Sequence, residues 1–161
     1  MDLLNSPKII AFSSSLDHAK SLRLQKQSIV FTNGCFDLLH AGHIYYLNAA
    51  KKQGDILWLG LNSDESVKTI KGIHRPIHPE SSRAFLLAHL NMVDFITIFN
   101  QATPIELIKQ IQPTIHIKGG DYQKSDLPET SVVEAYGGRV LIKPFLEGFS
   151  STAVIDKIKS S

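Results

Sequence analysis

Uninterrupted apolar runs recur along the chain, and their spacing gives the first indication of its fold. The run Ser28 to Thr32 lacks alternating polar positions, which is typical of a strand covered on both faces in a parallel sheet. Comparable runs follow at Ile56 to Leu61, Val93 to Phe99, Thr114 to Ile117 and Arg139 to Ile142. A segment able to carry a helix separates each run from the next. This alternation predicts an α/β fold with an open, mostly parallel five-stranded sheet and helices on both faces.

Several of the intervening segments carry recognisable helix signals. Ala41 to Gln53 is rich in helix formers. The stretch from Thr103 to Glu106 combines an N-cap, a proline at the first helical position and a glutamate three residues after the cap, which predicts a helix through Ile111. Further helices are predicted over Pro79 to Asn91 and from Ser151 to Lys159.

The opening of the chain and two polar stretches complete the predicted organisation. Ser13 to Gln27 predicts an additional helix, so residues 1–27 are assigned to an N-terminal helical extension and residues 28–161 to the main domain. Lys71 to His78 and Gly119 to Glu129 are richer in Gly, Pro and polar residues than their neighbours. We expect both to be loops, and loops of this kind often carry function.

Composition narrows the class of protein. A chain of 161 residues with 43% hydrophobic content fits one domain with a real core. The net charge of +2 is spread without basic runs, which argues against a nucleic-acid or membrane-surface binder. Cys35 is the single cysteine, which excludes an internal disulfide and fits a reducing compartment. No window approaches eighteen uninterrupted apolar residues, so the cytoplasm is the expected location.

The segment after the first predicted strand carries the candidate chemistry. Thr32 to His43 places a glycine turn and two histidines beside the carboxyl end of a central strand, where open α/β sheets bind ligands. A helix start offers free N–H groups, and Gly42 allows a phosphate to approach without a side chain in the way. His40 and His43, three residues apart, lie on one side of that start and can both donate to phosphoryl oxygens. The pattern indicates a phosphate site.

Two other interpretations of these residues remain open. A pair of histidines can ligate zinc, but no nearby carboxylate or thiol completes an obvious ligand set. Cys35 could act as a nucleophile, yet nothing in the sequence marks a base for it, which favours a small residue in a tight loop.

Together these motifs resemble the signature of the cytidylyltransferase-like nucleotidyltransferase superfamily, whose members share the H-x-G-H motif. Residues 33–37 and 40–43 carry the signature, and further matching segments follow in the order of one subgroup, the heptose-1-phosphate adenylyltransferases. These segments are Asn62-Ser63-Asp64, Lys71-Gly72, Arg75-Pro76, Arg83, Lys118 to Tyr122 and Glu147 to Thr152. The resemblance covers residues 28 to 158 and implies a Rossmann-like domain. It also implies transfer of AMP from ATP to heptose 1-phosphate, giving ADP-heptose for the lipopolysaccharide inner core and pyrophosphate.

The nearest rival is the glycerol-3-phosphate cytidylyltransferase type, which shares a similar histidine motif. It usually carries an arginine where this chain has Phe145, and its middle loop reads Gly-Asp-Asp rather than Gly119-Gly120-Asp121. Phe149 and Ser151 depart from the Arg and Thr that the heptose subgroup more often has, and a missing arginine weakens the local phosphate field. A non-catalytic nucleotide-binding module is a third alternative, disfavoured because both histidines and the Ser-Ser-Thr segment are present.

The resemblance also implies roles for individual residues. His40 and His43 bind the triphosphate, and Gly34, Cys35 and Phe36 provide backbone contacts in a turn that Asp37 orients. Lys71 and Arg83 neutralise phosphate. The remaining predicted nucleotide-binding residues are Asn33, Gly42, Gly119, Gly120, Asp121, Glu147, Ser150, Ser151 and Thr152.

Of these, Ser150, Ser151 and Thr152 open the last predicted helix and form either a second phosphate cradle or an ordinary cap. Mg²⁺ is expected with ATP, held mainly by phosphate oxygens and water, without a dedicated protein site. The expected partners are ATP and a sugar 1-phosphate, with neither nucleic acid nor membrane. A homodimer is one of the assemblies left open.

Overall fold

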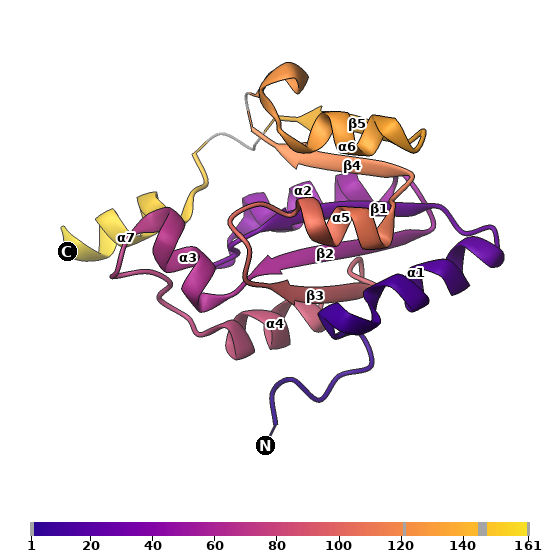
Figure 1. The fold of residues 1–161 in the computed structure, drawn as a ribbon. Coiled ribbons are helices and arrows are strands. Elements are labelled where there is room, and N and C mark those ends of the chain that lie inside the picture. Colours follow the sequence, from indigo (N-terminus) through magenta and orange to yellow (C-terminus); the bar gives the residue numbers. More distant parts are fainter. Residues whose placement is uncertain (1, 121, 145–147, 161) are drawn as a thin grey trace.

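Five parallel strands form the centre of the computed structural model, which describes residues 2–120, 122–144 and 148–160 (Figure 1). The strands are β1 (Ile29–Gly34), β2 (Ile56–Asn62), β3 (Phe95–Phe99), β4 (Ile115–Gly119) and β5 (Arg139–Lys143), in the order β3-β2-β1-β4-β5. The α-helices are α1 (Ser15–Leu24), α2 (Ala41–Lys51), α3 (Asp64–Lys71), α4 (Glu80–Ala88), α5 (Ile105–Ile111), α6 (Glu129–Ala135) and α7 (Ser151–Lys159), with short 3₁₀ turns at Phe12–Ser14 and Lys124–Asp126. The predicted α/β fold is confirmed, and every strand pair in the described sheet is parallel.

Each of the five apolar runs forms a strand, and the register shows why their apolar content is continuous. All seven residues of β2 are buried, since this strand lies between β1 and β3 and under helices on both faces. β1 pairs with β2 from Ile29 opposite Ile56 to Gly34 opposite Leu61. Four of the described strands, β1, β2, β4 and β5, reach one or two residues further toward their carboxyl ends than the apolar runs, because polar residues and glycines at that edge still take part in the ladder, whereas β3 ends with its run at Phe99.

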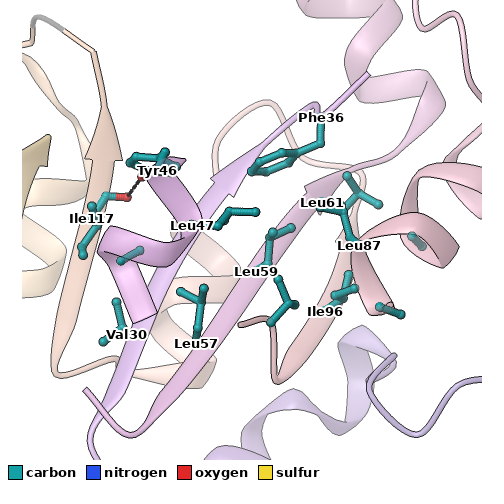
Figure 2. Packing of buried hydrophobic residues seen from close by; sticks show 14 of the residues in the cluster. Val30, Phe36, Tyr46, Leu47, Leu57, Leu59, Leu61, Leu87, Ile96 and Ile117 are labelled. Carbon is teal, nitrogen blue, oxygen red and sulfur yellow. Dashed lines mark hydrogen bonds between the residues drawn. The ribbon is translucent and has the colours of Figure 1, made fainter. Parts of the chain in front are cut away.

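Two hydrophobic clusters fill the space between the sheet and its helices. Figure 2 shows the first, in which α2 and α4 pack Leu47 and Leu87 against Leu57, Leu59 and Ile96 of the sheet. The second lies under α1, α5 and α6 and contains the fully buried Trp58. Helices therefore cover both faces of the sheet, as predicted.

The N-terminal segment shares this core with the rest of the chain. Ala19 and Leu22 of α1 belong to the second cluster, and Ile9 forms a parallel bridge with Ile96 of β3. The backbone at residues 8 and 10 exchanges hydrogen bonds with Ile96. Residues 1–27 thus extend the hydrophobic packing of residues 28–161 in the described structure.

The helices differ from the prediction in particular places. α4 is shorter than the predicted Pro79 to Asn91, because Pro79 is the N-cap and the helix ends at Ala88. α3 was not predicted, although Ser63 caps it by accepting a hydrogen bond from Ser66 N at 3.1 Å. Acidic residues in its first turn, lysines in its last and Gly72 beyond them were signals of a short helix. The predicted 71–78 loop consequently begins only after Lys71.

The topology fixes where a ligand site can form. The chain runs from β1 outward through β2 to β3, then crosses back to place β4 on the other side of β1. The carboxyl ends of β1 and β4 therefore flank a topological switch point, the crevice at which open α/β sheets bind ligands. In the described part of the chain, none of the helices is long and apolar enough to cross a membrane.

Candidate active site

A cleft of about 500 Å³ opens at this edge of the sheet. The carboxyl ends of β1, β2 and β4 and the residues after them form its floor, while α3, the segment before α5 and the start of α7 contribute walls. The lining includes Asn33, Gly34, Cys35, Phe36, Asp37, His43, Tyr46, Asn62, Ile70, Lys71, Thr103, Lys118, Gly119, Tyr122, Asp126, Glu129 and Ser151. The structure thus gathers a large part of the predicted site around one cavity.

The turn after β1 is anchored by the buried ring of Phe36. Phe36 has a φ of 44°, a left-handed conformation that is costly for a side chain of this size. Its ring is buried and lies 5.1 Å from the His43 ring, which anchors the turn in the core. A Cβ at Gly34 would lie 2.9 Å from that ring, so this position requires glycine. The turn is therefore built around the packing of Phe36.

Asp37 organises the loop that follows α3. Its carboxylate accepts hydrogen bonds from Ile77 N at 2.7 Å and His78 N at 3.1 Å, and it pairs with Arg75 Nε at 2.5 Å. Burial opposes ionisation, but the hydrogen bonds from Arg75, His78 and Ile77 outweigh it and lower the pKa of Asp37 below its ordinary value. Asp37 thus ties the β1 turn to residues 75–78, and its orienting role in nucleotide binding stays a prediction.

His40 and His43 form a stacked pair at the start of α2. Their ring centroids are 3.8 Å apart with the planes 26° from parallel, and His40 is the N-cap residue of the helix. Both Nδ1 atoms are buried without a hydrogen-bond partner in the described structure. His43 lines the cleft and His40 is not part of the lining, so Nε2 of His43 is the ring nitrogen of this pair that a ligand in the cleft can meet.

Gly42 has a different local role from the one predicted. A Cβ at this position would lie 3.0 Å from His40 Nδ1 and 3.0 Å from Phe149 Cβ. The space above Gly42 is therefore filled by the His40 ring and by the segment before α7. Glycine here lets His40 fold back over the helix start and stack on its partner.

Both histidines are held neutral at pH 7. Burial lowers the pKa of His40 below its ordinary value. Burial, followed by the proximity of His40 and Lys71, lowers the pKa of His43 to about 4. A neutral imidazole still donates one hydrogen bond, so the pair suits an anion that is already paired with its own cation.

Cys35 lies in the turn as a protonated thiol. Burial raises its pKa and outweighs the opposing effect of Lys71 and Arg83. This favours the small-residue interpretation of Cys35 over a nucleophile.

Two lysines supply positive charge to the cleft. Lys71 is exposed at the end of α3 and lines the cleft. Lys118, on β4, lies on the floor with its Nζ 3.3 Å from both Asn33 Oδ1 and Glu129 Oε1. Sequence reasoning placed Lys118 in a characteristic segment but gave it no role. The sequence signal that could have identified Lys118 as a site residue is its position at the carboxyl end of a buried strand.

Arg83 is not positioned for the predicted neutralisation of phosphate. It is 1% exposed, and all its nitrogens donate within the protein: Nε to His78 O, Nη1 to the carbonyls of Cys35 and Asn62, and Nη2 to Asp64 Oδ1. The guanidinium lies beneath the cleft and fastens the β1 turn to β2 and α3. The sequence could not reveal this, because an arginine early in a helix gives the same local pattern whether it binds phosphate or donates hydrogen bonds within the protein.

The three predicted residues at the start of α7 have different surroundings. Ser150 Oγ caps the helix by accepting from Ala153 N at 3.0 Å, whereas Ser151 Oγ donates to Leu38 O at 3.2 Å and lines the cleft. Thr152 is exposed and is not part of the lining. Phe149 lies near the His40 ring, with centroids 6.4 Å apart. This helix start therefore packs against the loop before α2 and beside the His40 ring, and it contributes Ser151 to the cleft.

The loop after β4 is described in part. Gly119 lines the cleft, while Gly120 is buried with a φ of 129° that favours glycine and donates its N–H to Lys143 O. The predicted residues Asp121 and Glu147 lie outside the described residues, as does Phe145. Among the residues that are described, no cluster of three His, Cys, Asp or Glu side chains could hold a metal ion.

Comparison with known proteins adds a family to this geometry. The model of a family described as cytidylyltransferase-like matches residues 31–157, which include the turn, the histidine pair, the β4 loop and the start of α7. The chain belongs to the cytidylyltransferase-like family. The predicted superfamily is confirmed, and with it the enzyme class, a nucleotidyltransferase.

Curated relatives are identical to this chain at about half of the aligned positions. The bifunctional protein HldE of Geobacter metallireducens is 52% identical over 132 residues, covering 82% of this chain and 27% of its own length. The corresponding protein of Helicobacter pylori is 47% identical over 153 residues, covering 95% of this chain and 31% of its own. The chain thus spans less than a third of the length of these relatives.

Solved structures show the same architecture. A lipopolysaccharide core biosynthesis protein from Thermoplasma volcanium matches with a TM-score of 0.63 and 29% identity, covering 74% of this chain and 97% of that one. A pantoate-β-alanine ligase from Francisella tularensis matches with a TM-score of 0.62 at 16% identity, a likeness of fold alone.

Proposed function

We propose that this family member transfers the adenylyl group of ATP to heptose 1-phosphate, forming ADP-heptose and pyrophosphate as a step toward the lipopolysaccharide inner core. The observation that carries the proposal is a single cleft lined by His43, which stacks on His40, together with Lys71 and Ser151 at the start of α7. The likeness to bifunctional HldE proteins and to a lipopolysaccharide core biosynthesis protein supports the choice of acceptor. We assign the activity to residues 28–161, with α1 as packing support.

The reaction needs no general base in this cleft. A non-bridging oxygen of the sugar phosphate forms a bond to the α-phosphorus of ATP, and the bond from that phosphorus to the α,β-bridging oxygen breaks. The bonding electrons leave with pyrophosphate. Because the nucleophile is already an anion at neutral pH, the protein must hold two repelling anions in line and stabilise charge on the phosphoryl oxygens.

The residues of the cleft suit that task. His43, stacked on His40, lines the cleft and can donate to the ligand through Nε2, and its neutral state lets it do so without a change of charge. Lys71 lies on an exposed helix end from which its flexible stem can approach the phosphates. The N–H groups at the start of α7 offer further donors, while Ser151, whose hydroxyl donates to Leu38 O, lines the cleft.

Mg²⁺ fits this site as the companion of the triphosphate. The described residues provide no cluster of three metal ligands, so phosphate oxygens and water would supply most of the coordination. Bound there, the ion would neutralise triphosphate charge. The cytoplasmic location and a homodimer stay predictions, and sedimentation of the purified chain would test the dimer.

A panel of nucleotides and acceptors tests the proposed reaction. The purified chain is incubated with Mg²⁺, one of ATP, CTP, GTP or UTP, and either heptose 1-phosphate or glycerol 3-phosphate. Pyrophosphate release is measured, and the sugar product is identified by mass. We expect release with ATP and heptose 1-phosphate, and loss of roughly 10²- to 10³-fold in kcat for His43→Ala. His89→Ala, at the exposed end of α4, serves as the control.

Other results would contradict the proposal in distinct ways. Pyrophosphate release with CTP and glycerol 3-phosphate would make this an alcohol-phosphate cytidylyltransferase. ATP binding without turnover of any acceptor would indicate a non-catalytic module. Full turnover by a folded His43→Ala variant would refute the role of the histidine pair.

A further inference from the structure

A buried carboxylate lies on the floor of a cleft that otherwise suits anions. Glu129, the first residue of α6, is 2% exposed and belongs to the cleft lining. A triphosphate would be repelled by this group, so the part of the substrate that faces it must be uncharged. A carboxylate only accepts hydrogen bonds, and that part must therefore be a donor.

The two oxygens of Glu129 have different surroundings. Oε1 lies 3.3 Å from Lys118 Nζ and 3.8 Å from His116 Nε2. His116 is fully buried on β4, and both of its ring nitrogens lack a hydrogen-bond partner in the described structure. Oε1 is thus turned toward the protein, while no hydrogen bond to Oε2 is seen among the described residues.

The surroundings of Oε1 also argue against a cation as the ligand of this carboxylate. Lys118 Nζ, beside Oε1, bridges to Asn33 Oδ1 at 3.3 Å, which fixes a positive charge at this point of the floor. A metal ion at Glu129 would lie close to that charge, and no cluster of three metal ligands occurs in the described part of the chain. A neutral donor meets no such repulsion.

We propose that Glu129 recognises a sugar hydroxyl of the substrate, accepting its hydrogen bond on Oε2 while Lys118 holds Oε1. This deepens the proposed function, since both ATP and a sugar 1-phosphate carry hydroxyls. A hydrogen bond to a charged acceptor is stronger than one between neutral groups, which gives Glu129 a role in specificity. Other α/β nucleotide sites use a carboxylate in the same way on a ribose hydroxyl.

Binding of substrates that each lack one hydroxyl tests this assignment. Dissociation constants are measured by calorimetry for ATP, 2′-deoxy-ATP, 3′-deoxy-ATP and purine riboside triphosphate, which lacks the adenine amino group. A second series uses monodeoxy heptose 1-phosphates in the presence of α,β-methylene-ATP. The wild-type chain should bind one deoxy compound roughly ten- to a hundredfold more weakly than its parent. Glu129→Ala should bind the parent and that compound equally, and the affected series identifies which sugar Glu129 contacts.

Matched variants separate recognition from folding. Glu129→Gln keeps an acceptor and the side-chain volume, so it should keep part of the discrimination. Glu134→Ala removes an exposed carboxylate from the same helix and should keep all of it. Thermal melting of each variant verifies the fold, and Glu129→Gln continues the test if the alanine variant does not fold.

Two outcomes would overturn the proposal. Equal discrimination in wild type and both Glu129 variants, in both series, would make Glu129 a structural partner of Lys118. If the Glu129 variants stop discriminating between ATP and purine riboside triphosphate but still discriminate against every deoxy compound, Glu129 contacts the base. These binding results stand whether or not the chain transfers AMP, so failure of the proposed reaction is distinguishable from failure of this inference.

Discussion

At the scale of single residues, the arrangement of the histidine pair depends on the space above Gly42. Gly42→Ala would place a Cβ 3.0 Å from both the His40 ring and Phe149 Cβ, so one of them must move. We expect the His40 ring to tilt away from His43 and kcat to fall roughly 10- to 100-fold, because small displacements of positioning groups are costly. Steady-state pyrophosphate release measures the effect.

A melting curve provides the control for this variant. Gly42 is in the first turn of α2, where its φ is not left-handed, so alanine does not strain the backbone. The melting temperature should therefore change little. Unchanged kcat in the folded variant would show that the stack is not needed.

The sequence was informative about some residues of the site and uninformative about others, for a physical reason. His40, Gly42 and His43 are neighbours in the chain, so their spacing on one helix start already placed them together. Arg75 contacts Asp37, 38 positions away, and Glu129 contacts Lys118, 11 positions away. No local sequence pattern reveals such contacts. Arg83 was assigned to phosphate from the resemblance, and its internal role was not visible because its four acceptors are distant from it in the sequence or lie on the backbone.

At the scale of elements, Arg83 joins β1, β2, α3 and α4 through one planar fork. Arg83→Lys keeps the charge but cannot reach three carbonyls and Asp64 at once. We expect the free energy of unfolding to fall by about 2–4 kcal/mol, since buried acceptors lose their donors. Urea denaturation measures this change.

Arg83→Met separates the two roles that Arg83 has been given. If positioning is the role, the lysine and methionine variants should be destabilised alike. Near-normal stability with lysine, together with a large loss of ATP affinity with methionine, would restore the phosphate-binding role.

The N-cap serines of α3 and α7 allow a matched comparison of two helices. Ser63 is buried and caps α3 within the fold, whereas Ser150 caps α7, in which no described residue is buried. Removing either cap costs about 1 kcal/mol locally. Ser63→Ala should lower global stability by that amount, and Ser150→Ala should leave it unchanged while weakening ATP binding through a frayed helix start.

Hydrogen exchange and calorimetry distinguish these effects. Amide protection should fall within α7 alone for Ser150→Ala, and across the chain for Ser63→Ala. A loss of global stability in the Ser150 variant would mean that α7 is packed more firmly than its exposed face indicates.

At the scale of the whole molecule, the apolar runs determined the sheet more closely than the helices. Each run formed a strand because burial on both faces demands continuous apolar residues, as β2 shows with all seven positions buried. α3 escaped prediction because Asp64 to Lys71 is short and polar and packs mainly through Val67. The strand order depends on the crossover between β3 and β4, which places β4 beside β1. No local sequence signal marks this crossover.

The buried histidine of β4 makes the whole fold sensitive to acid. Burial, followed by the charge of Lys118, lowers the pKa of His116 to about 3 from an ordinary value of 6.5. Between these two values the unfolded chain binds a proton at His116 that the native chain does not. Protonation therefore favours unfolding, and the stability that His116 confers is lost progressively as pH falls through that range.

His116→Leu isolates this effect from other groups that titrate in the same direction, such as His43 and Asp37. At pH 5 the wild-type chain should lose about 2 kcal/mol of unfolding free energy through His116 relative to pH 7.5. The leucine variant keeps an apolar side chain beside Phe31 and removes the unpartnered nitrogens, so its loss between the two pH values should be smaller by that amount. Urea denaturation at both pH values measures the difference. Equal losses in the two proteins would mean that protonated His116 pairs with Glu129, 3.8 Å away, and is stabilised in the native state.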